Sequence, residues 1–101
     1  CLRNEPFTAE EIDKYLIGLG EVTDMIPLAK PFTHLSETYG WSGWMHWETS
    51  GVHFYSWDKR SPVFFSVDLY TCKKFDPKVV HDFTEKRLKA THIVSKEVTL
   101  D

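Results

Sequence analysis

Nucleophilic, acidic and imidazole side chains recur at every second position through the middle of the chain. Such alternation is typical of β-strands that have one buried face and one open face. We assign one face the following residues: Trp44, His46, Glu48, Ser50, Gly51, His53, Tyr55, Trp57, Phe64, Ser66, Asp68, Tyr70 and Cys72. This set is too polar for a core and too aromatic for bare solvent, so it indicates a functional site, an interface or both.

Each candidate residue on this face also has a simpler interpretation. Ser50 beside Gly51 could lie in a turn, and Cys72 could be a buried inert thiol. Glu48 and Asp68 could bind a substrate ammonium or form ordinary salt bridges. Trp57 could stack on a ligand or lie in a dimer interface. Histidine and cysteine also bind zinc, but their spacing here matches no compact ligand motif, so we predict no metal site.

Two helices and a set of strands must position these residues. The capping box Thr8-Ala9-Glu10-Glu11 predicts a first helix, which Gly18 and Gly20 should end. Asp76-Pro77 predicts a second helix that ends near Ala90. The period-2 pattern predicts an extended segment and four strands, at residues 25–32, 44–49, 52–57, 63–72 and 91–98.

The second face of these strands is apolar and can be covered by the two helices: Met45, Trp47, Val52, Phe54, Phe65, Val67 and Leu69. The fold class that follows is α+β, a two-layer α/β sandwich with a mainly antiparallel sheet and two helices on one face. The 101 residues fit a single domain, residues 1–101. We expect a further strand before Cys1, and a half-covered sheet of this size favours a homodimer.

The composition limits the class of partner. Twelve basic and fifteen acidic side chains give a net charge of −3, and no basic run is present, so we expect no nucleic-acid partner. The chain has no apolar stretch long enough to span a membrane, so we expect no membrane partner. Its two cysteines are too few for a disulfide framework, which favours a reduced, cytoplasmic protein.

Three motifs together resemble the small prokaryotic S-adenosylmethionine decarboxylases. They are Trp41-Ser42-Gly43, Glu48-Thr49-Ser50 and the segment VDLYTCKKFDP that begins at Val67. The resemblance covers residues 40–98 and, more loosely, the first helix. It implies an S-adenosylmethionine decarboxylase-like sandwich, dimeric protomers, a self-cleaving chain with a pyruvoyl cofactor, and a place in polyamine and spermidine biosynthesis.

The resemblance also implies roles for individual residues. Ser50 matches the serine that becomes the pyruvoyl group, Ser42 the processing serine of a Ser-Gly turn, and Cys72 the proton donor of decarboxylation. Ser50 Oγ would attack the carbonyl of Thr49, and β-elimination followed by hydrolysis would leave a ketone. A ketone condenses with a substrate amine and accepts electrons as carbon dioxide leaves. The substrate implied is S-adenosylmethionine.

The chain departs from the family pattern at the base for the elimination. The family places histidine five residues after the processed serine, whereas this chain has Tyr55, whose reference pKa of about 10 makes it a weak base near neutral pH. His53, two residues earlier and on the face of Tyr55, is the candidate substitute. Glu48 is separated from Ser50 by Thr49, whereas the family has glutamate directly before the serine.

Three alternatives therefore stay open. The chain could be a non-catalytic, unprocessed family member that acts as a binding or regulatory subunit. It could decarboxylate another basic amino acid. It could also be a plain α+β interaction domain whose motifs match by chance.

Overall fold

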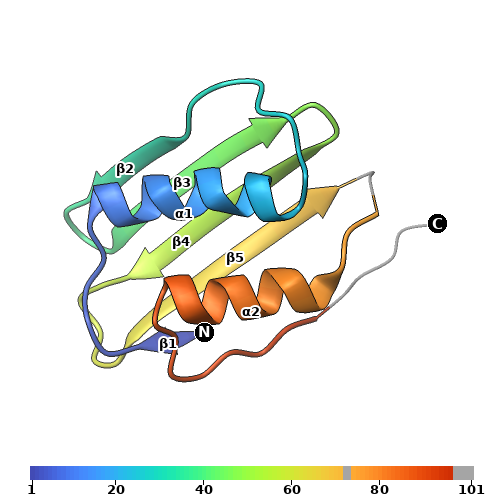
Figure 1. Ribbon diagram of the computed structural model, residues 1–101. Coiled ribbons are helices and arrows are strands. Elements are labelled where there is room, and N and C mark those ends of the chain that lie inside the picture. Colours follow the sequence, from blue (N-terminus) through green and yellow to red (C-terminus); the bar gives the residue numbers. More distant parts are fainter. Residues whose placement is uncertain (72–73, 97–101) are drawn as a thin grey trace.

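A five-stranded antiparallel sheet carries two helices on one face (Figure 1). This computed structural model describes residues 1–71 and 74–96, so Cys72 lies outside the described residues. The sheet order is β1-β5-β4-β3-β2. Along the chain the elements are β1 (Leu2–Arg3), α1 (Ala9–Val22), β2 (Phe32–Ser36), β3 (Gly40–Trp47), β4 (Ser50–Trp57), β5 (Val63–Thr71) and α2 (Pro77–Arg87). The predicted fold class is confirmed.

The predicted outer strands are wrong in part. Between α1 and β3 the strand is β2, and in residues 25–31 only Pro27 bridges to Trp47. Pro27 and Pro31 have no N–H to donate, which limits pairing before Phe32. In the described part of residues 91–98, a single bridge joins His92 to Leu2.

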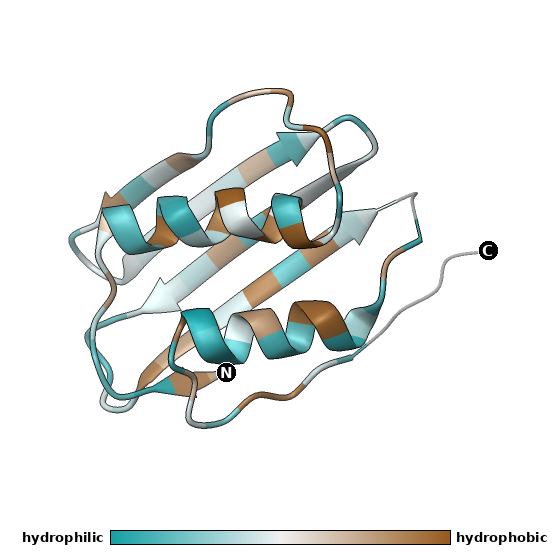
Figure 2. Cartoon of the chain, in the orientation of Figure 1, coloured by the Kyte–Doolittle hydropathy of each residue, from teal (hydrophilic) through white to brown (hydrophobic). Residues whose placement is uncertain are grey.

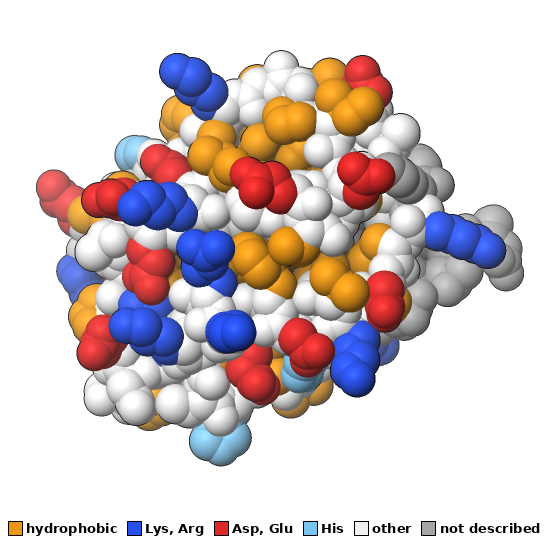
Figure 3. All heavy atoms as spheres, in the orientation of Figure 1, with side chains coloured by type: hydrophobic (Ala, Val, Ile, Leu, Met, Phe, Trp, Pro, Cys, Tyr) orange, Lys and Arg blue, Asp and Glu red, His pale blue; other side chains and the backbone are white. Residues whose placement is uncertain are grey.

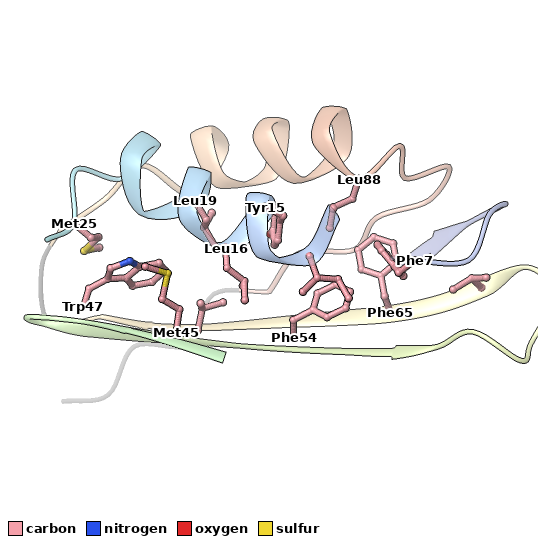
Figure 4. Packing of buried hydrophobic residues seen from close by; sticks show 13 residues of the cluster. Phe7, Tyr15, Leu16, Leu19, Met25, Met45, Trp47, Phe54, Phe65 and Leu88 are labelled. Atoms are coloured by element: carbon pink, nitrogen blue, oxygen red, sulfur yellow. The ribbon is translucent and has the colours of Figure 1, made fainter. Parts of the chain in front are cut away.

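The core lies between the helices and the sheet (Figure 4). Hydrophobic and hydrophilic residues mix along both helices, so each has an apolar side to turn inward (Figure 2). The predicted stripe of α1 is fully buried: Ile12, Tyr15, Leu16 and Leu19. It packs over buried residues of the three long strands, which include Met45, Trp47, Val52, Phe54 and Phe65. The outer surface of this layer intersperses basic and acidic side chains (Figure 3).

Two glycines that were predicted to end α1 lie inside it instead. A Cβ at Gly18 would lie 2.7 Å from the Phe83 ring, and a Cβ at Gly20 would lie 2.5 Å from Trp47 Nε1. These positions need glycine because large aromatic rings approach the helix closely there. The two glycines, which were interpreted as the end of the helix, allow close packing of aromatic rings against it.

Tyr15 joins the two helices inside the core. Its hydroxyl is 2.7 Å from Thr84 Oγ1, and both residues are buried. Burial raises the pKa of Tyr15 far above its ordinary value, and the hydrogen bond with Thr84 only partly opposes this.

Replacing Tyr15 with phenylalanine should lower the free energy of unfolding by about 1–2 kcal/mol at pH 7, because the buried Thr84 hydroxyl loses its partner. The unfolded tyrosine ionises near pH 10, while the folded one stays neutral. The contribution of Tyr15 is therefore complete below pH 10 and is lost as the pH rises above it. Urea unfolding from pH 7 to 11 should show that the free energy of unfolding of Tyr15→Phe falls less at alkaline pH than that of the wild type. Tyr39→Phe, at a tyrosine that is 64% exposed, is the control. Equal alkaline losses in the wild type and Tyr15→Phe would contradict the prediction.

Candidate functional site

The face of the sheet that turns away from the helices carries most of the predicted site set. Cross-strand pairing aligns Trp44 with His53 and His53 with Asp68. It also aligns Ser42 with Tyr55 and Tyr55 with Ser66. Because paired residues share a face, this surface is the open face that the alternation predicted.

Aromatic rings pack along this open face. Trp44 lies between Phe32 and His46, with ring centroids 5.5 Å and 4.8 Å away. Trp57, the last residue of β4, packs against Phe64 with ring centroids 5.1 Å apart. Trp44 is nevertheless 38% exposed and Tyr55 43% exposed, since the two described helices both lie over the other face. The open face therefore offers apolar rings to a ligand or a partner.

A hollow of about 380 Å³ lies at the end of the open face next to the β3–β4 turn. Its only charged lining residue, among the residues described, is Asp68. The lining is His46, Thr49, Ser50, Gly51, His53, Asp68 and Tyr70. A hollow with a carboxylate, imidazoles and an aromatic ring suits a positively charged ligand that also has an apolar part.

Ser50 lies at the edge of this hollow, but its side chain is on the helix-covered face. It pairs with Trp47 and Thr71, and Trp47 is buried in the core. Its Oγ donates to Thr71 Oγ1 at 2.7 Å and lies 3.1 Å from Met25 Sδ. The prediction that Ser50 shares the open face is therefore wrong. Glu48 and Thr49 form a two-residue turn between Trp47 and Ser50, so the alternation does not continue across it.

The other predicted residues fall into two groups along β4. His53 and Asp68 line the hollow near Ser50, and Glu48 is exposed in the adjoining turn. Ser42, Tyr55 and Trp57 lie toward the other end. Ser42 is inside β3 and not in a turn. The following Gly43 lies under α1, where a Cβ would come within 3.2 Å of Ile12.

Tyr55 and Ser50 are well separated within one chain. Five residues along a strand span about 17 Å, and an odd number of steps places side chains on opposite faces. His53 likewise lies on the face opposite to the Ser50 side chain, because it is three positions further along the strand. Thus neither candidate base lies beside the Ser50 hydroxyl in this protomer.

Two direct neighbours of Ser50 were not predicted from the sequence. Thr71 lies in the strand predicted at residues 63–72, and the pairing of that strand with Ser50 would have identified it. Met25 comes from the segment after α1, where no motif pointed to it. Both are revealed only by the register of the sheet and the path of the chain.

The residues present fit a pyruvoyl group at Ser50. The serine is the first residue of β4, its hydroxyl is held by hydrogen bonding, and the preceding Thr49 is exposed in the turn. The Thr49–Ser50 bond therefore joins a solvent-exposed turn to an ordered strand.

Two further structural features concern metal binding and membrane-spanning helices. Among residues 1–71 and 74–96, no group of three or more His, Cys, Asp or Glu side chains is arranged to hold a metal ion. Within the same residues, no helix is long and apolar enough to cross a membrane.

Comparison with known proteins supplies the family. Searches of curated proteins and of solved structures found no match. A family model described as S-adenosylmethionine decarboxylase matches residues 5–99, nearly the whole chain. The match extends from before α1 to beyond α2 and includes Ser42, Ser50 and Cys72. The chain therefore belongs to the S-adenosylmethionine decarboxylase family.

Proposed function

We propose that the chain is a pyruvoyl-dependent decarboxylase of the S-adenosylmethionine type, which cleaves itself between Thr49 and Ser50. The observation that carries this proposal is the position of Ser50, with a hydrogen-bonded hydroxyl at the start of β4 directly after an exposed turn. The family match supports the proposal that this serine takes part in self-cleavage.

Self-cleavage needs only atoms of the chain and one water. Ser50 Oγ attacks the Thr49 carbonyl carbon, the C–N bond breaks, and the hydroxyl proton passes to the Ser50 nitrogen. A base then removes the Cα proton of residue 50, and elimination releases Thr49 as a carboxylate. Hydrolysis of the remaining dehydroalanine releases ammonia and leaves the pyruvoyl ketone. That ketone supplies the electron sink for decarboxylation, and Cys72 is the proposed proton donor.

The proposed substrate is S-adenosylmethionine, which carries positive charge beside apolar atoms. The Asp68 carboxylate in the hollow favours a cation, and the exposed Tyr70 offers a ring face. Glu48 in the turn adds a second carboxylate nearby. The same features fit another basic amino acid, which is the second candidate substrate. If the substrate is S-adenosylmethionine, its decarboxylated product would enter polyamine synthesis.

We propose a homodimer formed through the open face. That face has exposed rings at Trp44, Tyr55 and Tyr70, and both described helices lie over the opposite face. The candidate processing residues Ser42 and Tyr55 lie about 17 Å along β4 from Ser50 and on the other side of the sheet. Two copies packed by their open faces would bring one copy's Ser42 and Tyr55 over the hollow that adjoins the other copy's Ser50.

A non-catalytic binding or regulatory subunit is the alternative function. The feature that favours it is Tyr55, a poor base in the position where the family has histidine. Such a subunit would keep the hollow and the open face but leave the Thr49–Ser50 bond intact.

Intact mass and a denaturing gel of the purified protein test the proposal. We expect two fragments that meet at the bond before Ser50, and a single species for Ser50→Ala, which lacks the nucleophile. Ser95→Ala, at an exposed serine that follows α2, should be cleaved like the wild type. The cleaved protein should release carbon dioxide from S-adenosylmethionine, with arginine and lysine as competing substrates. Full-length wild type after prolonged incubation would support the non-catalytic alternative.

A further inference from the structure

Ser50 has a hydroxyl partner that is fixed by strand pairing. Thr71, the last residue of β5, lies directly opposite Ser50 in the register of the sheet. The two oxygens are 2.7 Å apart, an ordinary length for an O–H···O hydrogen bond. Because two paired strands hold the partners, this contact does not depend on a loop.

Among the residues described, the remaining neighbours of the Ser50 hydroxyl are weaker acceptors or poorly placed. Met25 Sδ is 3.1 Å away, and a thioether sulfur accepts hydrogen bonds only weakly. Thr49 Oγ1 is 3.3 Å away and sits in the exposed turn. His53 and Tyr55 belong to the opposite face of the sheet. Thr71 is therefore the acceptor that sets the direction of the Ser50 side chain.

We propose that Thr71 is a positioning residue for self-cleavage, an inference that rests on the proposed function. It fixes the rotamer of Ser50, and that rotamer decides how Oγ approaches the Thr49 carbonyl carbon. In this step the Oγ–C bond forms, the C–N bond breaks and the hydroxyl proton ends on the Ser50 nitrogen, which gives an ester with a free amine. Thr71 gains no proton overall. Its contribution is orientation, for which a small displacement carries a large cost in rate.

Thr71→Val tests this inference because valine keeps the branched shape and removes the hydroxyl. Thr71→Ser restores a hydroxyl, and Thr71→Ala removes it without adding a methyl group that could crowd Ser50. Thr38→Val, at an exposed threonine of the β2–β3 turn, is the matched control. Circular dichroism compares the fold of all variants.

The readout is intact mass in the presence and absence of hydroxylamine. Hydroxylamine cuts the ester and leaves Thr49 as a hydroxamate, so it measures the first step without the later elimination. We expect Thr71→Val and Thr71→Ala to slow this cut at least about tenfold. Thr71→Ser should be cut at a rate within about threefold of the wild-type rate, and Thr38→Val should be cut at the wild-type rate.

Two other outcomes overturn the inference and distinguish it from the proposed function. If Thr71→Val or Thr71→Ala is cut as fast as the wild type, or Thr71→Ser is as slow as these two variants, Thr71 does not position Ser50 through its hydroxyl. The proposed function then stands. If hydroxylamine cuts no protein of the set, the wild type included, Ser50 does not attack Thr49, and the proposed function falls together with this inference.

Discussion

Replacing Arg3 with methionine is expected to lower the free energy of unfolding by about 3–5 kcal/mol, a large part of the stability of a small domain. Arg3 is 2% exposed and sits where β1, α1 and the end of α2 meet. Both Nη atoms bond the Glu11 carboxylate, at 2.7 Å and 2.9 Å. Methionine would fill much of the volume but make none of these bonds.

The loss should be large because every donor group of Arg3 is used. Nε donates to the Glu5 carbonyl, Nη1 also to Leu88 and Nη2 also to Pro6. The guanidinium also lies 3.7 Å from the centre of the Phe7 ring. Its removal leaves three carbonyl groups and a carboxylate without their donors. The Leu88 carbonyl among them is buried, where an unmet polar group is costly.

Urea unfolding of matched variants measures this effect. Lys14→Met removes an exposed ion pair with Glu10, so its midpoint should barely move. Arg3→Lys should recover only part of the stability, because an ammonium cannot reproduce the planar fork. Arg3→Met with Glu11→Leu should be less damaging than the sum of the two single changes. An effect of Arg3→Met no larger than that of Lys14→Met would contradict the prediction.

The local patterns predicted the elements that have strong end signals. Thr8 accepts from the Glu11 amide, and Asp76 accepts from the Lys78 amide ahead of α2, as the caps predicted. The three long strands were found because their apolar set faces a continuous helix layer. Hydrophobic burial enforces that alternation, so it is visible in the sequence.

The features that were predicted wrongly, or not at all, depend on partners that are distant in the sequence. Arg3 gave no signal, since its burial depends on the packing of Leu88, which accepts one of its bonds across 85 positions. Gly20 looked like a helix end because the approaching Trp47 ring could not be foreseen. Ser50 was assigned to the wrong face because alternation does not carry through a two-residue turn. The candidate site was thus predictable as a set of residues, while its division between two faces required the register.

The separation of Tyr55 from Ser50 leads to the prediction with the largest expected increase in the rate of processing. Tyr55→His should speed the release of the two fragments at least about 100-fold, because an imidazole replaces a phenol as the base for the elimination. Ester formation, measured with hydroxylamine, should change little, since it precedes the elimination. Tyr55→Phe removes the phenol without adding a base and should not accelerate release. Tyr39→His, at an exposed tyrosine of the β2–β3 turn, is the control.

A mixed assembly then shows in which chain the base acts. Tyr55→His combined with Ser50→Ala cannot cleave itself, but in a homodimer joined by the open faces its imidazole would lie over the hollow that adjoins the partner copy's Ser50. We expect this double variant, marked by a mass tag, to accelerate cleavage of the wild-type chain when the two are mixed and refolded together. Acceleration confined to chains that carry the Tyr55→His change and also keep Ser50 would place the base within one chain and contradict the face-to-face dimer. No acceleration by Tyr55→His in any mixture would mean that the base does not limit processing, which favours the binding-subunit alternative.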